Sequence, residues 1–161
     1  MRLLILAALP LIAATPECPP GTPSSALPPR GWRAPVTVAA GQTAEAAPAI
    51  AVNQPARVGL APGAALRFAL PPERAPDPAS RGGTVAVEVA KPGRYSVGLG
   101  TSAWIDVVRD GAALPAIAHG HGASCWGLRK LVTFDLSPGR YLIQLSGAKV
   151  ETTTLVVIPA R

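Results

Sequence analysis

The sequence predicts an all-β protein, an antiparallel β-sandwich of the jelly-roll type preceded by an extended Pro-rich leader. Three observations predict this fold. Pro (19) and Gly (16) are abundant in a chain of 161 residues, and both residue types disfavour helices. Short apolar runs alternate with turn signals, which is typical of sandwiches and barrels. No stretch of a dozen residues keeps a helical period, and the length suits one domain.

Residues 1–14 have the features of a secretory signal peptide. A positive charge at Arg2 precedes an apolar run from Leu3 to Ala14 that ends in small residues. The run is too short to span a bilayer as a stable helix. We therefore expect a periplasmic or secreted protein that begins near Thr15 and has no transmembrane span in its mature chain. An uncleaved N-terminal anchor is the alternative.

Residues 15–35 form a Pro-rich leader, which we expect to be extended, with Trp32 packed against the edge of the domain. Cys18 lies in this leader, and Cys125 lies in the C-terminal third of the chain. In an oxidising compartment an even pair of cysteines usually closes a disulfide. A metal thiolate or a redox pair is the alternative. We predict a Cys18–Cys125 disulfide that ties the leader to the domain.

The sandwich domain is expected over residues 36–161. Alternation is clearest in the segment 84–89, where Val85, Val87 and Val89 share one face. Asp110-Gly111 is a tight-turn signal, and residues 71–83 are expected to form a surface loop. The candidate strands are Val36–Ala39, Arg57–Leu60, Ala65–Leu70, Thr84–Val89, Tyr95–Leu99, Trp104–Val108, Leu114–Ala118, Leu131–Leu136, Tyr141–Leu145 and Thr154–Ile158.

One segment recurs within the domain: Val89–Tyr95 is similar to Asp135–Tyr141. In each copy an apolar run ends, Pro-Gly makes a turn, and Tyr opens the next run. The repeat predicts two hairpins of a sandwich, with Tyr95 and Tyr141 each packing a corner.

These features resemble the bacterial pre-peptidase C-terminal domain. A Gly-rich start at residues 81–83 leads to an apolar strand, a Pro-Gly-x-Tyr turn and a strand that contains Trp104-Ile105-Asp106. The similarity covers about Pro62 to Pro159. It implies a β-sandwich module of exported proteins that acts as an accessory or binding domain, without catalysis.

The segments Ala103–Val108 and His119–Cys125, with Arg129-Lys130, also resemble a group of small exported proteins from α-proteobacteria. That group has no established function and often carries the name homogentisate 1,2-dioxygenase. The name implies iron held by two histidines and a glutamate. This chain has two histidines and no glutamate near them, so an iron site would need a distant acid.

His119 and His121 are the sharpest candidates for metal ligands. Residues i and i+2 of an extended chain point to the same side, so the two imidazoles could chelate one ion. Cys125 or an acid could complete a set suited to copper or zinc. A disulfide at Cys125 would remove that third ligand and favour an exposed loop without metal. No cofactor is therefore predicted, and a transition metal is the alternative.

A net charge of +6 and a basic C-terminal half favour an anionic envelope component or surface as the partner, although they could equally serve solubility. The predicted binding surface holds Trp126, Arg129 and Lys130 beside the two histidines. Trp104 and Trp126 could stack a ligand such as a sugar, but the apolar neighbours of Trp104 favour a core position.

Other function classes are disfavoured. Nucleic acid is not an expected partner, because the protein is exported and lacks basic–aromatic interleaving. No nucleophile–base arrangement or carboxylate pair is legible, so no catalytic residue is predicted. The sequence predicts a non-catalytic binding or accessory protein of the bacterial envelope. The alternative is a metal-dependent enzyme that uses His119 and His121 as ligands.

Overall fold

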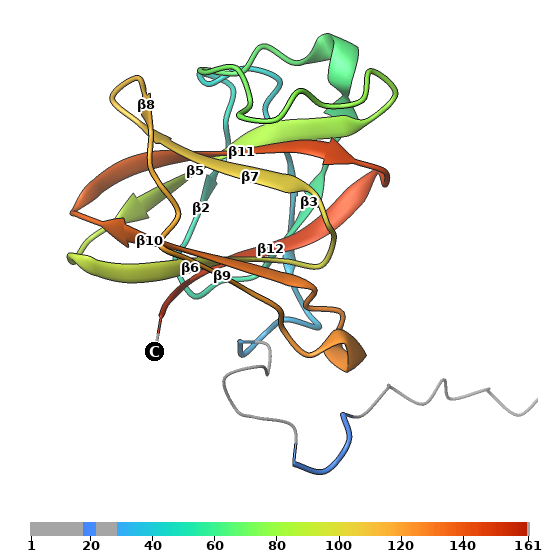
Figure 1. Ribbon diagram of the computed structural model, residues 1–161, viewed down its shortest axis with the longest axis vertical. Helices are drawn as coiled ribbons and strands as arrows, with labels where there is room; N and C mark the ends of the chain where they lie inside the picture. The colour runs from blue at the N-terminus through green and yellow to red at the C-terminus, as the bar shows by residue number, and fades with distance from the viewer. Residues whose placement is uncertain (1–17, 22–28, 161) are drawn as a thin grey trace, which may run out of the picture.

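The computed structural model describes residues 18–21 and 29–160, and it shows two six-stranded sheets packed face to face (Figure 1). The predicted signal peptide, residues 1–14, lies outside the described residues, as does part of the leader. No helix in the described ranges is long and apolar enough to cross a membrane.

The strands of each sheet lie side by side in the following spatial order. Sheet A contains β1 (Val36–Ala39), β3 (Ala56–Gly59), β12 (Thr152–Pro159), β6 (Gly93–Leu99), β10 (Lys130–Leu136) and β9 (Ala118–Gly120). Sheet B contains β2 (Ala49–Ile50), β5 (Arg81–Val89), β11 (Gly139–Ala148), β7 (Trp104–Arg109) and β8 (Ala112–Ala113), and β4 (Ala61–Pro62) also pairs with β5.

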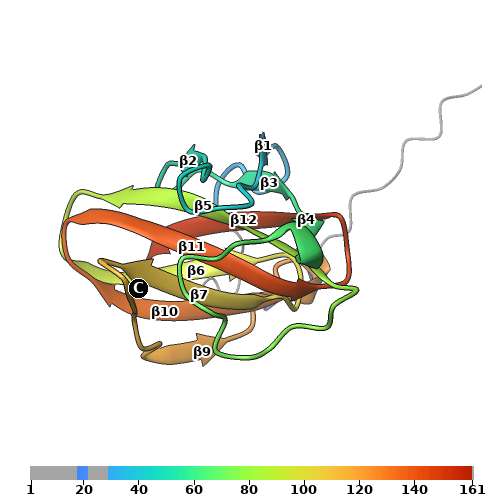
Figure 2. The ribbon, with the colours of Figure 1, turned by 90° about the horizontal axis from the view of Figure 1, so that it is seen from above.

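The strand order is that of a jelly roll, as predicted. Strands that follow one another in the chain mostly alternate between the sheets, so that β3-β12-β6-β10 faces β5-β11-β7-β8. A jelly roll is built from two Greek keys, and its two four-stranded sheets have this strand order. Figure 2 shows the two layers from above, with β9 at one margin and β1 and β2 at the other.

The sheets are mixed and not purely antiparallel. Two short strands join in parallel: β1 pairs with β3, and β2 pairs with β5. Both precede the sandwich strands in the chain and add to its outer strands. All other strand pairs are antiparallel.

Two expected strands are absent at their predicted positions. Of residues 65–70, Ala65 ends a 3₁₀ turn (Gly63–Ala65), and residues 66–70 run as a loop over sheet B. Residues 114–117 also form no strand, because Pro115 has no N–H for a ladder, and the strand β9 begins only at Ala118. The Asp110-Gly111 turn is confirmed: both residues have positive φ, as a type I′ turn between β7 and β8 requires.

The main core lies between the two sheets and is built from alternate residues of each strand. Val85, Val87 and Val89 of β5 all face it, as the alternation predicts. A second apolar cluster lies on the outer side of sheet A, where Trp32 packs with Leu128 and Val156. Trp32 is only 7% exposed, so the leader docks against the domain at this residue.

The repeated Pro-Gly-Arg-Tyr segments form two equivalent corners. The Tyr95 hydroxyl donates to the Lys91 carbonyl oxygen at 2.9 Å, and the Tyr141 hydroxyl donates to the Ser137 carbonyl oxygen at 2.9 Å. Tyr141 has two further partners, because its oxygen also accepts from the Ser137 N–H at 3.0 Å and from the Arg109 guanidinium at 2.9 Å. The repeat therefore has a structural role.

Removing each hydroxyl should destabilise the domain by different amounts. Tyr95→Phe loses one hydrogen bond and should lower the free energy of unfolding by about 1 kcal/mol. Tyr141→Phe loses three bonds, one of them to a charged group, and should lower it by about 2 to 3 kcal/mol. Urea denaturation of both variants measures the difference. Equal losses would show that the extra partners of Tyr141 contribute nothing.

Candidate functional site

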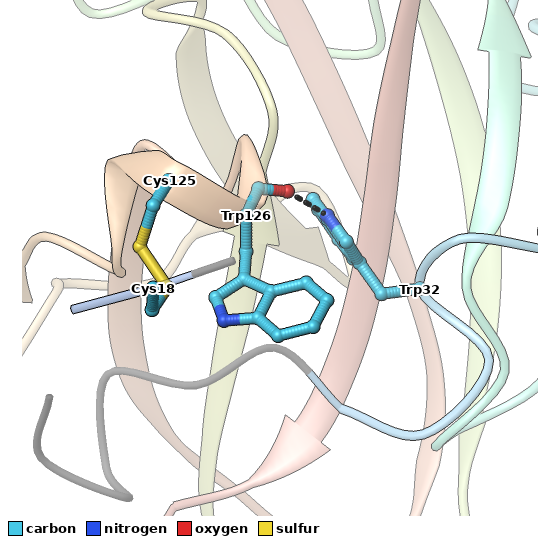
Figure 3. The surroundings of a disulfide bond; sticks show 4 residues. All are labelled: Cys18, Trp32, Cys125 and Trp126. Carbon is cyan, nitrogen blue, oxygen red and sulfur yellow. Dashed lines mark hydrogen bonds between the residues drawn. A yellow bond between two sulfur atoms is a disulfide. The ribbon is translucent and has the colours of Figure 1, made fainter. Parts of the chain in front are cut away.

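The disulfide and two tryptophans hold the leader against the end of sheet A (Figure 3). The predicted Cys18–Cys125 disulfide is present, with Cys125 in the 3₁₀ turn Ser124–Trp126. The Trp32 indole N–H donates to the Trp126 carbonyl oxygen at 2.9 Å. The Arg33 guanidinium carbon lies 3.8 Å from the centroid of the Trp126 ring, a cation–π distance. Trp126 therefore contacts the leader on its ring and on its main chain.

Four of the predicted site residues meet in one open groove. His119, His121, Arg129 and Lys130 line a hollow of about 330 Å³ together with Thr101, Ser102, Gly120 and Leu131. His119 reaches it from the edge strand β9, and Lys130 reaches it from the start of β10. Trp126, which we predicted beside them, does not line this groove. The described lining carries cationic and imidazole groups and no carboxylate.

His121 is oriented by the main chain. Its Nδ1 lies 3.1 Å from the Arg129 carbonyl oxygen. A carbonyl oxygen only accepts, so Nδ1 carries the proton and donates. The Nε2 atom is then the one that can accept a hydrogen bond or bind a metal ion.

The metal-ligand hypothesis gains no third ligand from the described residues. Cys125 is in the disulfide, and the described ranges contain no group of three or more His, Cys, Asp or Glu that could hold a metal ion. A site of two histidines and one glutamate, as the dioxygenase name implies, does not fit these residues.

Lys130 links the groove to the outer face of sheet B. Its ammonium donates to the Ala103 carbonyl oxygen at 3.1 Å and lies 5.0 Å from the centroid of the Trp104 ring. Burial lowers the pKa of Lys130, and the Asp106 carboxylate partly opposes this shift. The Trp104 indole N–H in turn donates to Asp106 Oδ1 at 3.1 Å.

A row of buried polar side chains crosses the outer face of sheet B. Thr84, Gln144 and Asp106 are opposite one another on β5, β11 and β7, and none is more than 8% exposed. They are buried because the loop of residues 63–80 lies over this face (Figure 1). Gln144 holds the loop: its amide N–H donates to the Leu70 carbonyl oxygen at 3.0 Å, and its oxygen accepts from the Leu70 N–H at 3.2 Å.

This covered face was missed from the sequence. Trp104 was expected in the core, but it faces outward, opposite Ser146 on β11, and is half-buried. Trp104, Asp106 and Val108 alternate along β7 with the core residues Ile105 and Val107. This alternation was the signal in the sequence that Trp104 faces outward. The long loop of residues 63–80 covers this outer face of sheet B and partly encloses it.

Comparison with known proteins assigns this chain to no family. No protein-family model matches the chain, and no curated protein matches it.

The buried Asp106 carboxylate should destabilise the domain at neutral pH. Burial raises its pKa above the ordinary value of 3.8, although the Trp104 hydrogen bond lowers it. The folded state therefore holds this proton more tightly than the unfolded state, so stability falls as pH rises through the window above 3.8 and stays low beyond the folded-state pKa.

Asp106→Asn removes this charge and keeps an oxygen for the Trp104 N–H. The variant should match the wild type at about pH 3 and exceed it in unfolding free energy at about pH 7, as measured by urea denaturation. Asp110→Asn is the control, because Asp110 is exposed at the other end of β7 and should show no such gain. A lower stability of the Asp106 variant at neutral pH would contradict the interpretation.

Proposed function

We propose that this protein is an exported, non-catalytic binding or accessory protein of the bacterial envelope, and that the groove of His119, His121, Arg129 and Lys130 takes its anionic partner. The observation that carries the proposal is the groove's lining. Arg129, Lys130 and two histidines line it, and no carboxylate of the described residues does. Guanidinium and ammonium groups recognise phosphate or carboxylate groups through charge-assisted hydrogen bonds.

Export is supported by the disulfide. Disulfides persist in oxidising compartments such as the periplasm or the cell exterior, and this bond closes a separation of 107 residues. The jelly roll is in keeping with the resemblance to pre-peptidase C-terminal domains, which implies accessory or binding work.

Vesicle binding tests the groove. The wild type should sediment with vesicles of phosphatidylglycerol in phosphatidylcholine and not with phosphatidylcholine alone, and the binding should weaken between about 50 and about 200 mM salt. The triple variant His119→Ala, His121→Ala and Arg129→Ala should bind the anionic vesicles about fivefold less. Lys130 is left in place, because its ammonium also bonds to Ala103.

Arg140→Ala is the matched control, since it removes one exposed formal charge from β11 in the other sheet. This variant should bind like the wild type. Equal binding by the triple variant and the control would contradict the assignment of the groove as the binding site. Net charge would then be the cause of binding.

The metal-dependent enzyme remains a second candidate, because both histidines line one groove and His121 Nε2 is available. Native mass spectrometry of the purified protein decides between the two. One stoichiometric transition metal that is lost in the His119→Ala, His121→Ala variant would favour the enzyme. The binding-protein proposal expects the same metal-free mass, apart from the substitutions, in both proteins.

A further inference from the structure

A second hollow shares the lining residue Ser102 with the histidine groove. Its volume is about 450 Å³. A smaller hollow of about 170 Å³ adjoins it and shares five lining residues with it, namely Pro76, Asp77, Ser80, Ser146 and Gly147. We name the two together the loop cleft, because the loop of residues 63–80 forms one wall and sheet B forms the other. Its size is that of a small-molecule site.

Trp104 gives the larger hollow an aromatic wall. The ring is half-buried, and its position is fixed, since its N–H is held by Asp106 and the Lys130 ammonium lies over it. Lys130 itself does not line the loop cleft. A fixed aromatic surface suits a ring with an apolar face, and little side-chain entropy is lost on binding.

Ser146 supplies a polar group that still needs a partner. Its side chain is 2% exposed, and its hydroxyl has no hydrogen-bond partner among the described residues. The residue lines both parts of the loop cleft. A buried hydroxyl without a partner is costly, and a ligand oxygen would satisfy it where a small shift of the loop opens the hydroxyl to the cleft.

The charge at the mouth is positive. Arg74 and Lys149 line the larger hollow and are exposed, and neither forms an ion pair with any residue that the structure describes. The acidic residue of the lining is Asp77, whose Oδ1 already accepts the Ala79 N–H at 2.8 Å within the loop. The cleft therefore favours a ligand with a negative group.

The smaller hollow is apolar. Leu66, Phe68, Pro76 and Pro78 line it. A small apolar substituent of a ligand held in the larger hollow would be buried there.

We propose that the loop cleft binds an acidic, N-acylated sugar unit: its ring packs on Trp104, its carboxylate lies near Arg74 and Lys149, its oxygens reach Ser146, and its acyl group enters the apolar hollow. This site is separate from the histidine groove and does not depend on the function proposed for that groove.

Isothermal titration calorimetry with N-acetylmuramic acid tests the proposal, because this sugar has both a carboxylate and an acetamido group. N-acetylglucosamine, which lacks the lactyl ether that carries the carboxylate, should bind about fivefold more weakly. The N-formyl analogue of the acid, which lacks only the acyl methyl group, should bind about fourfold more weakly. These comparisons use the unaltered protein, so folding does not affect them. Absence of saturable binding, or equal affinity for all three sugars, would overturn the proposal.

Two variants locate the site. Trp104→Ala should weaken binding about tenfold, and the double variant Arg74→Ala, Lys149→Ala should weaken it about fivefold. The matched control is Arg57→Ala, Lys91→Ala, which removes the same two charge types from exposed positions outside the cleft and should keep wild-type affinity. Unchanged affinity in the Arg74, Lys149 variant, which alters only exposed side chains, would contradict the site even if Trp104→Ala failed to fold.

Discussion

Two hydrogen bonds between the Gln144 amide and the main chain of Leu70 hold the loop of residues 63–80 over sheet B. The outer face of an antiparallel sheet can remain in water. Here it carries Thr84, Asp106 and Gln144, polar residues that would suit that exposure, yet all three are buried. The loop encloses this polar face, and the hollows beside Trp104 exist because the loop stands over the sheet without filling all of the space. The second site of this molecule thus depends on the Gln144 contact.

Sheet A is covered by the leader. The disulfide and Trp32 draw the leader across the end of sheet A, where Trp126 accepts a hydrogen bond from Trp32. The histidine groove and the loop cleft share Ser102. Lys130 connects them, because it lines the groove and its ammonium lies over the Trp104 ring of the cleft. Cationic side chains line both hollows. The two proposals therefore rest on the same chemistry, which is the recognition of acidic ligands.

Much of this structure could be predicted from local patterns. Period-two alternation located the long strands, the Asp110-Gly111 pair located its turn, and the repeat located both tyrosine corners. Two cysteines in a chain that was expected to be exported were enough to predict the disulfide. The loop cleft could not be predicted, because it depends on where residues 63–80 cross the sheet. That position depends on non-local contacts such as the one from Gln144 to Leu70, 74 residues apart. Trp104 was expected in the core because its neighbours are apolar, although its alternation with Ile105 and Val107 was a local signal for the outer face. Trp126 was expected in the groove because it is close in sequence to His121, whereas its contacts with Trp32 and Arg33 are non-local.

The most direct test follows the indole N–H signals of the three tryptophans by ¹H–¹⁵N NMR while N-acetylmuramic acid is added. The structure separates them: Trp104 lines the loop cleft, whereas Trp32 and Trp126 lie at the leader. We predict a saturable shift of the Trp104 indole signal and of the amide signals of Arg74, Ala75, Asp77, Ala79 and Ser80, with the signals of Trp32 and Trp126 unchanged. Shifts confined to Trp32 and Trp126, or no shift at saturating sugar, would contradict the account.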